Sequence, residues 1–570
     1  MINKSWCSLR FCTLFSGLLV CLAGCSDDGV MVNVDQSFVL KDREIVNSDS
    51  AYIPAQCYAK VKQENGNVSN PCYSCHVDGV RPNFLHDDSG LQSTLDFTDY
   101  SSINRYDNLF KDRSAEVMAI TDKAIQSYIS ESNYFDKNGE IILTKTLDQV
   151  PANWDANKDG HWNGFTPDTY FNINEEGFDI DPSGKATGWV AFSYYPFLGG
   201  FMPTNGSTDD VFIRLPEDFR ANKKGNYDAD VYKLNLAIVE SLIREKDVSI
   251  SETDEQIYQV DLNKNGTLDT SNKVVYQWAP LKNINMSYVG KAALTYASKK
   301  NEIAAGLYPK GTEFLHSVRY ISTDGNAISM ADRLKELRYS VKTTWNNYSQ
   351  LSKSVSSEIK ERNDFPNRVS QYHSSRSGGI ESGLINGRGW KYQGFIEDKH
   401  GALRPQNFEE TLACMGCHTG IGATTDSSFA FPRKFGFDSF KHGYYHWSEK
   451  GLQGIADPIR ADGHHEYSYY LKNTQTADEF GGNSEVENKF SKQGEWIPEE
   501  LEKIKHDISH LLLPSVARAN TLNKAYKVIV DEQSYIYGRD PHVLPVKNVY
   551  ESIPVGEDTG IENPITSNNL

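Results

Sequence analysis

The sequence is short of cysteine, of positive charge and of long apolar runs, and each shortage excludes a class of protein. Only nine of its 570 residues are cysteine, and four of the nine lie within the first 25 residues. A chain of this length with so few cysteines is not a disulfide scaffold. The 58 basic residues are outnumbered by 76 acidic ones. This balance argues against a nucleic-acid partner and favours a soluble, acidic surface.

No apolar run after the N-terminus reaches the length of a membrane-spanning helix. The first 24 residues hold Lys4 and Arg10 but no acid, and an apolar run covers residues 11–23. This pattern is typical of a secretory signal, so we expect the chain to be exported. The signal ends in LAGC, which resembles a bacterial lipobox. The resemblance implies acylation of Cys25 and a lipid anchor in the cell envelope; ordinary cleavage nearby is the alternative.

Four of the remaining cysteines belong to two copies of one motif, CYSCH at residues 72–76 and CMGCH at residues 414–418. The residues concerned are Cys72, Cys75 and His76 in the first copy and Cys414, Cys417 and His418 in the second. C-x-x-C-H is typical of covalent haem attachment, in which both thiols bond the haem and the histidine binds its iron. Zinc needs four ligands per site, and a redox dithiol does not need the histidine. We therefore interpret both motifs as haem sites, with zinc and a dithiol as alternatives; only Cys57 is left over.

With these motifs and the export signal, the chain resembles bacterial dihaem c-type cytochrome lipoproteins. That group is distantly similar to the dihaem cytochrome c peroxidases and to rubber-oxygenase-like proteins. The resemblance covers the signal and two short motifs, and the wide spacing between the motifs departs from the peroxidases. It implies two covalently bound c-type haems, with thioethers at the four motif cysteines and with His76 and His418 as proximal iron ligands.

The ligand on the far side of each iron separates an electron carrier from an enzyme. Our candidates are His316, Met330, His442 and His446. His316, in the strand-like KGTEFLHSVRYIS, is the first candidate to face His76 across the iron, and Met330 opens the helix expected next. His442 and His446 would share one face if FKHGYYHWSEKG were helical. For each candidate the alternative is an ordinary packed or hydrogen-bonded side chain.

Two stretches have the spacing of calcium-binding loops, DANKDGHWNGFTPD and DLNKNGTLD. Alternate oxygen-bearing side chains precede a glycine at the sixth place, where the loop turns tightly. The candidate ligands are Asp155, Asn157 and Asp159 in the first loop and Asp261, Asn263, Asn265 and Asp269 in the second. Neither loop has a glutamate at its twelfth position, so both resemble dockerin-like loops and would be structural staples. Asx-rich turns without metal are the alternative.

The hydrophobic pattern predicts a mainly α fold with much irregular structure and a few short β-strands, packed around two haems. The expected stretches are a signal peptide (1–24), a polar tether (25–50), a first haem-binding segment (51–140), a loop- and strand-rich region with the calcium-like loops (141–325), a long amphipathic helix (326–366), a second haem-binding segment (367–490) and C-terminal helices with a tail (491–570). The clearest helix covers residues 331–362, where apolar residues recur every three or four positions. Further helices are expected over residues 498–513 and 515–535.

Together these features predict an exported, lipid-anchored dihaem cytochrome that passes electrons to redox partner proteins of the cell envelope, at the outer membrane facing the periplasm. The alternative is a peroxidase- or oxygenase-like enzyme with one open haem. A subunit of a larger cytochrome assembly is the weaker alternative. The length of the chain favours an enzyme, but no acid–base group around an open iron can be named from the sequence.

Overall fold

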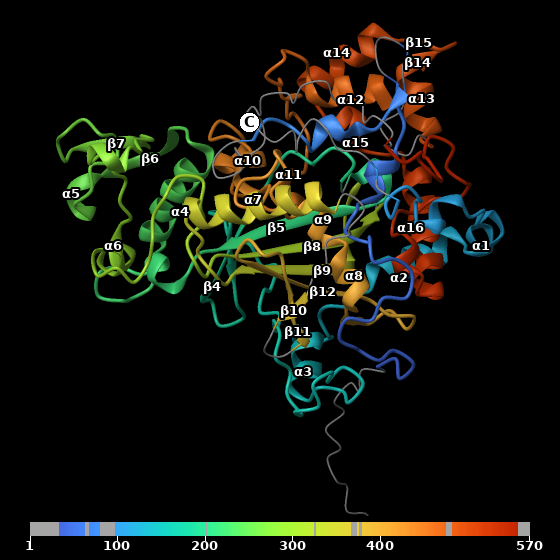
Figure 1. Ribbon diagram of the computed structural model, residues 1–570, viewed down its shortest axis with the longest axis horizontal. Helices are drawn as coiled ribbons and strands as arrows, with labels where there is room; N and C mark the ends of the chain where they lie inside the picture. Colours follow the sequence, from blue (N-terminus) through green and yellow to red (C-terminus); the bar gives the residue numbers. More distant parts are fainter. Residues whose placement is uncertain are drawn as a thin grey trace, which may run out of the picture. The chain divides into compact units, whose positions relative to one another are not determined.

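The computed structural model describes residues 34–62, 66, 68–79, 97, 99–200, 202–323, 327–365, 373–375, 379–474 and 482–556. The expectation of a mainly α fold is wrong, because the centre of the unit formed by residues 33–570 is a nine-stranded antiparallel sheet (Figure 1). Its strands lie in the order β10-β11-β12-β9-β8-β5-β4-β3, and β13 also pairs with β12.

The strands of this sheet come from three of the expected stretches, 141–325, 326–366 and 367–490. They are β3 (Phe178–Ile180), β4 (Ala186–Phe192), β5 (Thr208–Arg214), β8 (Glu313–Ser322), β9 (Ser329–Lys342), β10 (His373–Ser375), β11 (Gly379–Ile385), β12 (Trp390–Glu397) and β13 (Leu403–Pro405). Three small hairpins are β1 (Val61–Lys62) with β2 (Val68–Ser69), β6 (Val248–Asp254) with β7 (Thr270–Val274), and β14 (Ser491–Lys492) with β15 (Glu495–Trp496).

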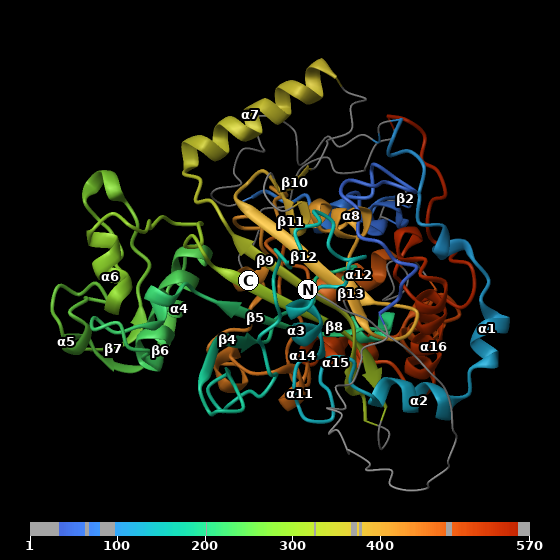
Figure 2. The same ribbon diagram turned by 90° about the horizontal axis from the view of Figure 1, so that it is seen from below.

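Helices surround the sheet, and most of them are short. They are α1 (Ser114–Ala119), α2 (Asp122–Ser130), α3 (Ile142–Asp148), α4 (Ala229–Arg244), α5 (Glu255–Tyr258), α6 (Gly290–Ala297), α7 (Tyr348–Asp364), α8 (Phe408–Leu412), α9 (Cys414–Cys417), α10 (Ala430–Arg433), α11 (Trp447–Lys450), α12 (Glu466–Thr474), α13 (Ser484–Phe490), α14 (Pro498–His506), α15 (Ser509–Leu512) and α16 (Val516–Glu532). Figure 2 shows α4, α5 and α6 with the β6–β7 hairpin at one end of the sheet and α1, α2 and α16 at the other.

The sheet buries both of its faces. Successive residues of a strand point to opposite faces, so Phe212, Leu315 and Leu337 pack into one core with Trp154 and Trp189. On the opposite face Ile213, Phe314 and Tyr392 pack into a second core. Because the strands of the middle of the sheet are covered on both sides, their sequences lack the simple apolar–polar alternation of a half-exposed strand.

The long helix expected over residues 326–366 is replaced by strand β9, a turn and helix α7. Glu336 pairs with Val318 and Leu334 with Arg319, which leaves Lys335 as an extra residue between them, a β-bulge. The bulge puts Leu334 and Leu337 on the same face although they are three residues apart, and both are fully buried. Apolar residues three positions apart are also typical of a helix, and for this reason the sequence pattern predicted a helix here.

We expect Leu337→Ala to lower the free energy of unfolding by about 2–5 kcal/mol, because it leaves a cavity in the core beneath the sheet. Leu281→Ala is the matched control, since the Leu281 side chain is fully exposed. Urea unfolding followed by tryptophan fluorescence measures both. Equal effects of the two substitutions would contradict the assignment of Leu337 to the core.

Candidate functional site

The face of the sheet that carries Ile213 and Phe314 also carries His316 and Arg338, and we call it the cavity face. Val211, His316, Arg338 and Gly394 are direct neighbours across β5, β8, β9 and β12. Above this row lie two cavities of about 220 Å³ each. Each is several times larger than the ~30 Å³ share of one water molecule, so each has room for a ligand.

The first cavity and the second cavity share one wall, which includes Cys414, Cys417, Phe197 and Arg338. The first cavity is further lined by Gln56, Cys75, Tyr106, Ser207, Glu336, Glu410, Tyr526, Tyr535, Arg539 and Asp540, among others. The second is further lined by Phe192, Tyr194, Phe314, His316, Tyr339, Trp390, Tyr392, His418, Phe429 and Arg433, among others. The second predicted motif therefore stands between the two cavities.

Helices α8 and α9 present the second motif to the cavities. Asn407 begins α8 with a capping box to Glu410, an arrangement that fixes where a helix starts. Gly416, inside the motif, lies against the segment around Tyr52: a Cβ at this position would stand 1.7 Å from the Tyr52 carbonyl oxygen. The glycine therefore allows the N-terminal segment to pack directly on α9.

His418 lies in the second cavity with one ring nitrogen already engaged. Its Nδ1 is 3.0 Å from the carbonyl oxygen of Ser427, so Nδ1–H donates and Nε2 keeps its lone pair. Burial lowers the pKa of His418 to about 4, which keeps the imidazole neutral. A neutral imidazole oriented by a backbone carbonyl is the usual form of a metal-binding histidine.

A buried ion pair holds the loop that orients His418. Asp426 and Ser427 both have positive φ, 50° and 63°, a conformation that non-glycine residues seldom adopt. The ammonium group of Lys342 binds the Asp426 carboxylate, which also accepts the Tyr308 backbone N–H at 2.9 Å. These contacts stabilise the strained loop and thereby place the Ser427 carbonyl.

The first predicted motif lies beside the second. A short 3₁₀ helix, Pro71–Ser74, carries Cys72, and the backbone N–H of His76 donates to the Cys72 carbonyl at 2.7 Å. The backbone carbonyl of Cys75 accepts a hydrogen bond from the backbone N–H of Ala423 at 3.0 Å, and Cys75 lines the first cavity. The two motifs, far apart in the sequence, are thus brought to one place, although Cys72 and His76 line neither cavity.

Burial suppresses the acidity of these thiols. It raises the pKa of Cys72 to about 12 and that of Cys417 to about 11, so both are neutral thiols at pH 7. Cys57 lies close to them and its pKa is raised by burial too. Cys57 has no role in either motif.

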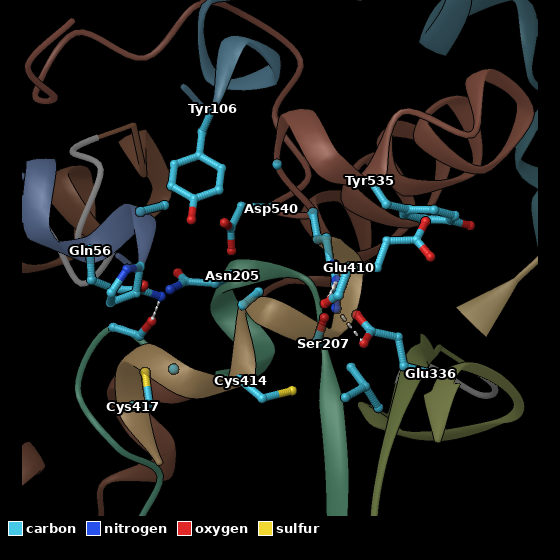
Figure 3. A pocket seen from close by; sticks show the side chains of 18 of the residues that line it. Gln56, Tyr106, Asn205, Ser207, Glu336, Glu410, Cys414, Cys417, Tyr535 and Asp540 are labelled. Atoms are coloured by element: carbon cyan, nitrogen blue, oxygen red, sulfur yellow. Dashed lines mark hydrogen bonds and ion pairs between the residues drawn. The ribbon is translucent and has the colours of Figure 1, made fainter. Parts of the chain in front are cut away.

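Glu336 is the centre of a charged network at the first cavity. Its Oε2 accepts from Arg338 at 2.9 Å, from Arg539 at 2.8 Å and from Gln406 at 2.9 Å. Gln406 reaches Glu336 across Gly394, where a Cβ would stand 2.4 Å from the amide oxygen. Burial alone would raise the pKa of Glu336, but the two guanidinium groups lower it to about 2. Figure 3 shows Cys414 and Cys417 on one wall and Glu336 and Glu410 on another.

His316 lies in the second cavity, where it shares the space with His418 and not with His76. Its Nε2 is 2.7 Å from Oδ2 of Asp209, a buried carboxylate that also accepts from the Tyr194 hydroxyl. Burial raises the pKa of Asp209, an effect that its contact with His316 opposes. The prediction that His316 binds iron stays untested, and this nitrogen already has a partner.

The other predicted distal ligands lie elsewhere. Met330 pairs with Ile321 in the β8–β9 ladder and lines neither cavity. His442 is exposed and stacks on Phe437. His446 is the N-cap residue of α11, and its two ring nitrogens contact Ser448 and Asp210 at 2.6 and 2.8 Å.

His442 and His446 do not share a helical face, because the chain has positive φ at His442 and α11 begins only after His446. Asp209 and Asp210 are consecutive in β5 and point to opposite faces of the sheet. His446, held by Asp210, therefore lies on the other face from His316.

The first calcium-like loop has a defined turn. Asp155 accepts the backbone N–H groups of Asp159 and Gly160 at 3.2 and 2.8 Å, and Asn157 accepts that of Asp159 at 2.9 Å. Lys158 and Gly160 have positive φ. The buried carboxylate of Glu381 accepts two backbone N–H groups of the loop, those of residues 156 and 157.

The second calcium-like loop repeats this arrangement. Asp261 accepts the Gly266 backbone N–H at 2.9 Å, and Asn263 accepts that of Asn265 at 3.0 Å. Asp269 accepts from the Asn265 amide at 3.0 Å. Buried Glu255 is equivalent to Glu381 of the first loop, because it accepts the backbone N–H groups of residues 262 and 263. Both loops therefore have the same turn and the same buried glutamate behind it.

Several residues of the site carry no recognisable signal in the sequence. Asp209, Glu336, Arg338, Tyr526 and Arg539 belong to no motif. A strand assignment of β5 and β9 would have put the first three on one face, but the leucine spacing around the bulge at Lys335 favoured a helix for β9. Tyr526 and Arg539 come from α16 and the segment after it, and only the tertiary fold places them at the cavity.

The lipid anchor, membrane-spanning helices and metal clusters are the remaining features to report. Cys25, the predicted lipidation site, lies outside the described residues. Within the part of the chain that the structure describes, no helix is long and apolar enough to cross a membrane. In the same part, no three or more His, Cys, Asp and Glu side chains are grouped so as to hold a metal ion.

Residues 42–507 match a family model described as a "-like lipoprotein". An uncharacterized lipoprotein of Aquifex aeolicus (strain VF5) is 28% identical over 572 residues, which cover 92% of this chain and 90% of the relative. No solved structure matches the chain.

We expect Gly416→Ala to destabilise the protein by about 3 kcal/mol or more, because the added methyl group collides with backbone, which cannot rotate away. Gly436→Ala is the control, since no atom lies within 4 Å of a Cβ there. Thermal unfolding measures both variants. A normal unfolding temperature for Gly416→Ala would contradict the close packing of the N-terminal segment on α9.

Proposed function

The chain belongs to this lipoprotein family, and we propose that it is an exported, lipid-anchored dihaem c-type cytochrome that transfers electrons. The observation that carries the proposal is the meeting of the two C-x-x-C-H motifs: Cys75, Cys414 and Cys417 line one cavity. Bound haem would supply the reversible one-electron chemistry of iron. We place the protein at the outer membrane facing the periplasm, with redox proteins of the cell envelope as partners.

The residues around the second motif fit a haem. Many aromatic side chains line the second cavity, including Phe314, Trp390 and Tyr392, and no aspartate or glutamate is among the described residues that line it. Such walls suit a flat apolar macrocycle. Cys414 and Cys417 lie on its wall, and neutral His418 offers Nε2. Of the first motif, Cys75 lines the first cavity. Residues 80–96, which follow this motif closely, lie outside the described residues.

The chain has three tasks in this proposal. Its cysteines bind the cofactor covalently, and the Ser427 carbonyl orients the proximal imidazole of His418. The buried aromatic walls exclude water, which lowers the cost of rearranging solvent when charge moves. Bringing the two motifs together shortens the path between the two cofactors.

A second candidate function is a peroxidase- or oxygenase-like enzyme with one open iron. The observation that favours it is the contact between His316 and Asp209, because an imidazole held by a carboxylate is suited to proton transfer. Ferric electron paramagnetic resonance separates the two candidates: two low-spin signals support electron transfer, and a high-spin signal with rapid reaction with peroxide supports the enzyme.

We expect the wild-type protein to contain two haems per chain by the pyridine haemochrome assay. Replacement of both Cys414 and Cys417 by serine removes one haem, because both thioether bonds at that motif are lost. Cys57→Ser is the matched control and keeps two haems, since Cys57 lies outside both motifs. A haem-free wild-type protein, matured in a host that attaches haem to other c-type cytochromes, would overturn the proposal.

We also propose that the two Asx-rich loops bind Ca²⁺ as structural staples. Support comes from the repeated turn and from the oxygen-bearing side chains at alternate positions. Each loop contributes two aspartates, with asparagine and backbone oxygens as the remaining ligands.

Calcium at 100 times its Kd is expected to stabilise the protein by about 2.7 kcal/mol per site, seen as a rise of the unfolding temperature that a chelator reverses. Asp261→Ala loses part of this gain because the second loop loses its first ligand. Asp181→Ala, in an Asx turn without the calcium spacing, keeps it. No response of the wild type to calcium would contradict the assignment.

A further inference from the structure

The polar end of the first cavity contains a buried hydroxyl group that has no partner. Tyr526 is 2% exposed, lines the first cavity, and its Oη makes no hydrogen bond to any described residue. Burial raises the pKa of Tyr526 well above its ordinary value, so the hydroxyl keeps its proton and remains a donor. An unpaired buried donor destabilises the folded state, and a ligand with an acceptor atom would remove this cost.

Two guanidinium groups lie at the same end of the cavity. Arg338 and Arg539 both bind a single oxygen of Glu336, at 2.9 and 2.8 Å. Two positive charges therefore share one carboxylate. Arginine is the side chain best suited to bind carboxylates, because its planar group offers several parallel donors.

The acidic residues around this end are for the most part already engaged. Glu410 accepts two bonds from Arg404, both 2.8 Å, and Glu409 accepts three backbone N–H groups, those of residues 46–48. Asp540 also lines the cavity, and its negative charge opposes an anion. Next to these groups, buried Lys335 donates to Ser207 at 3.0 Å, and burial lowers the pKa of Lys335 to about 7.

The first cavity is thus lined by polar donors as well as by thiols. Cys75, Cys414 and Cys417 share the lining with apolar residues such as Phe197 and Leu198, and Tyr526, Arg338 and Arg539 add hydrogen-bond donors to the same lining. Figure 3 shows the cysteines and Glu336 on separate walls. A ligand that fits has an apolar body near the sulfurs and an acidic oxygen at the donor end.

We infer that Tyr526, Arg539 and Arg338 form a carboxylate-binding subsite, and that its ligand is a propionate group of a haem attached at the cysteines of this cavity. The assignment rests on the proposed function. A free carboxylic acid has the same chemistry, and the experiment below distinguishes the two sources.

Tyr526→Phe is the sharpest variant, because it removes only the oxygen atom. In haem-free protein that hydroxyl has no partner, so its loss leaves the free energy of unfolding unchanged or slightly raised. In the haem-loaded protein the same change removes a hydrogen bond to the propionate. The unfolding temperature should therefore fall in the loaded form only, a difference that a purely structural role for Tyr526 would not produce.

The midpoint potentials give a second readout. Donors and positive charge at a propionate favour the reduced cofactor, so Arg539→Gln should lower one of the two potentials, and Tyr526→Phe should lower the same one by less. The expected shift for Arg539→Gln is threefold to tenfold in the reduction equilibrium, up to about 59 mV. Tyr288→Phe is the control and leaves both potentials unchanged, because Tyr288 lies in the core beside α6 and bonds the Glu302 carbonyl at 3.2 Å.

Calorimetric titration with sodium propionate identifies the source of the carboxylate. If the haem propionate fills the subsite, haem-loaded wild-type protein shows no saturable binding of the free acid. Saturable binding that Tyr526→Phe weakens tenfold would mean that the subsite accepts a free acid, and would overturn the assignment. Unchanged potentials and stability in both Tyr526→Phe and Arg539→Gln would overturn it too. Failure of the proposed function has a different signature, the absence of haem from the wild type.

Discussion

The alternation of side chains across β5, β8, β9 and β12 is the constraint on which the rest of the structure depends. One face of these strands carries Phe212, Leu315 and Leu337 into a closed apolar core. The other carries His316 and Arg338 as direct neighbours beneath the two cavities. A slip of one residue in the register would exchange the two sets. The apolar core therefore secures the register, and the register places the polar residues of the site.

The charges of the site are kept in place by pairing. Glu336 holds Arg338 and Arg539, Arg404 forms two hydrogen bonds to Glu410, and Lys342 holds Asp426. Buried ion pairs add little net stability, because removing charges from water costs about as much as their attraction returns. In this site the ion pairs instead hold side chains and loops in fixed positions. The Lys342–Asp426 pair constrains a backbone loop that would otherwise relax, and the carbonyl of that loop orients His418.

The contacts that bring the two motifs together come from regions that are distant in sequence. The segment around Tyr52 packs on Gly416, and Ala423 bonds the carbonyl of Cys75. The types of the residues in these two contacts do not predict them. Gly416 is no exception, because glycine is also common in turns. No sequence pattern indicated these contacts, because they join segments that are far apart in the sequence and that line the same cavities.

The sequence by itself determined the local features whose spacing is chemical: two C-x-x-C-H motifs, two Asx-rich loops and a secretory signal with a lipobox-like end. It did not determine the sheet. The bulge at Lys335 gave β9 a helical spacing of leucines, and strands buried on both faces lost their alternation. Only the tertiary structure decided that His316 lies with His418, that His446 lies on the opposite face, and that Tyr526 and Arg539 reach the first cavity. The physical reason is that short-range spacing acts within a few residues, whereas pairing between strands and packing of helices join residues hundreds of positions apart.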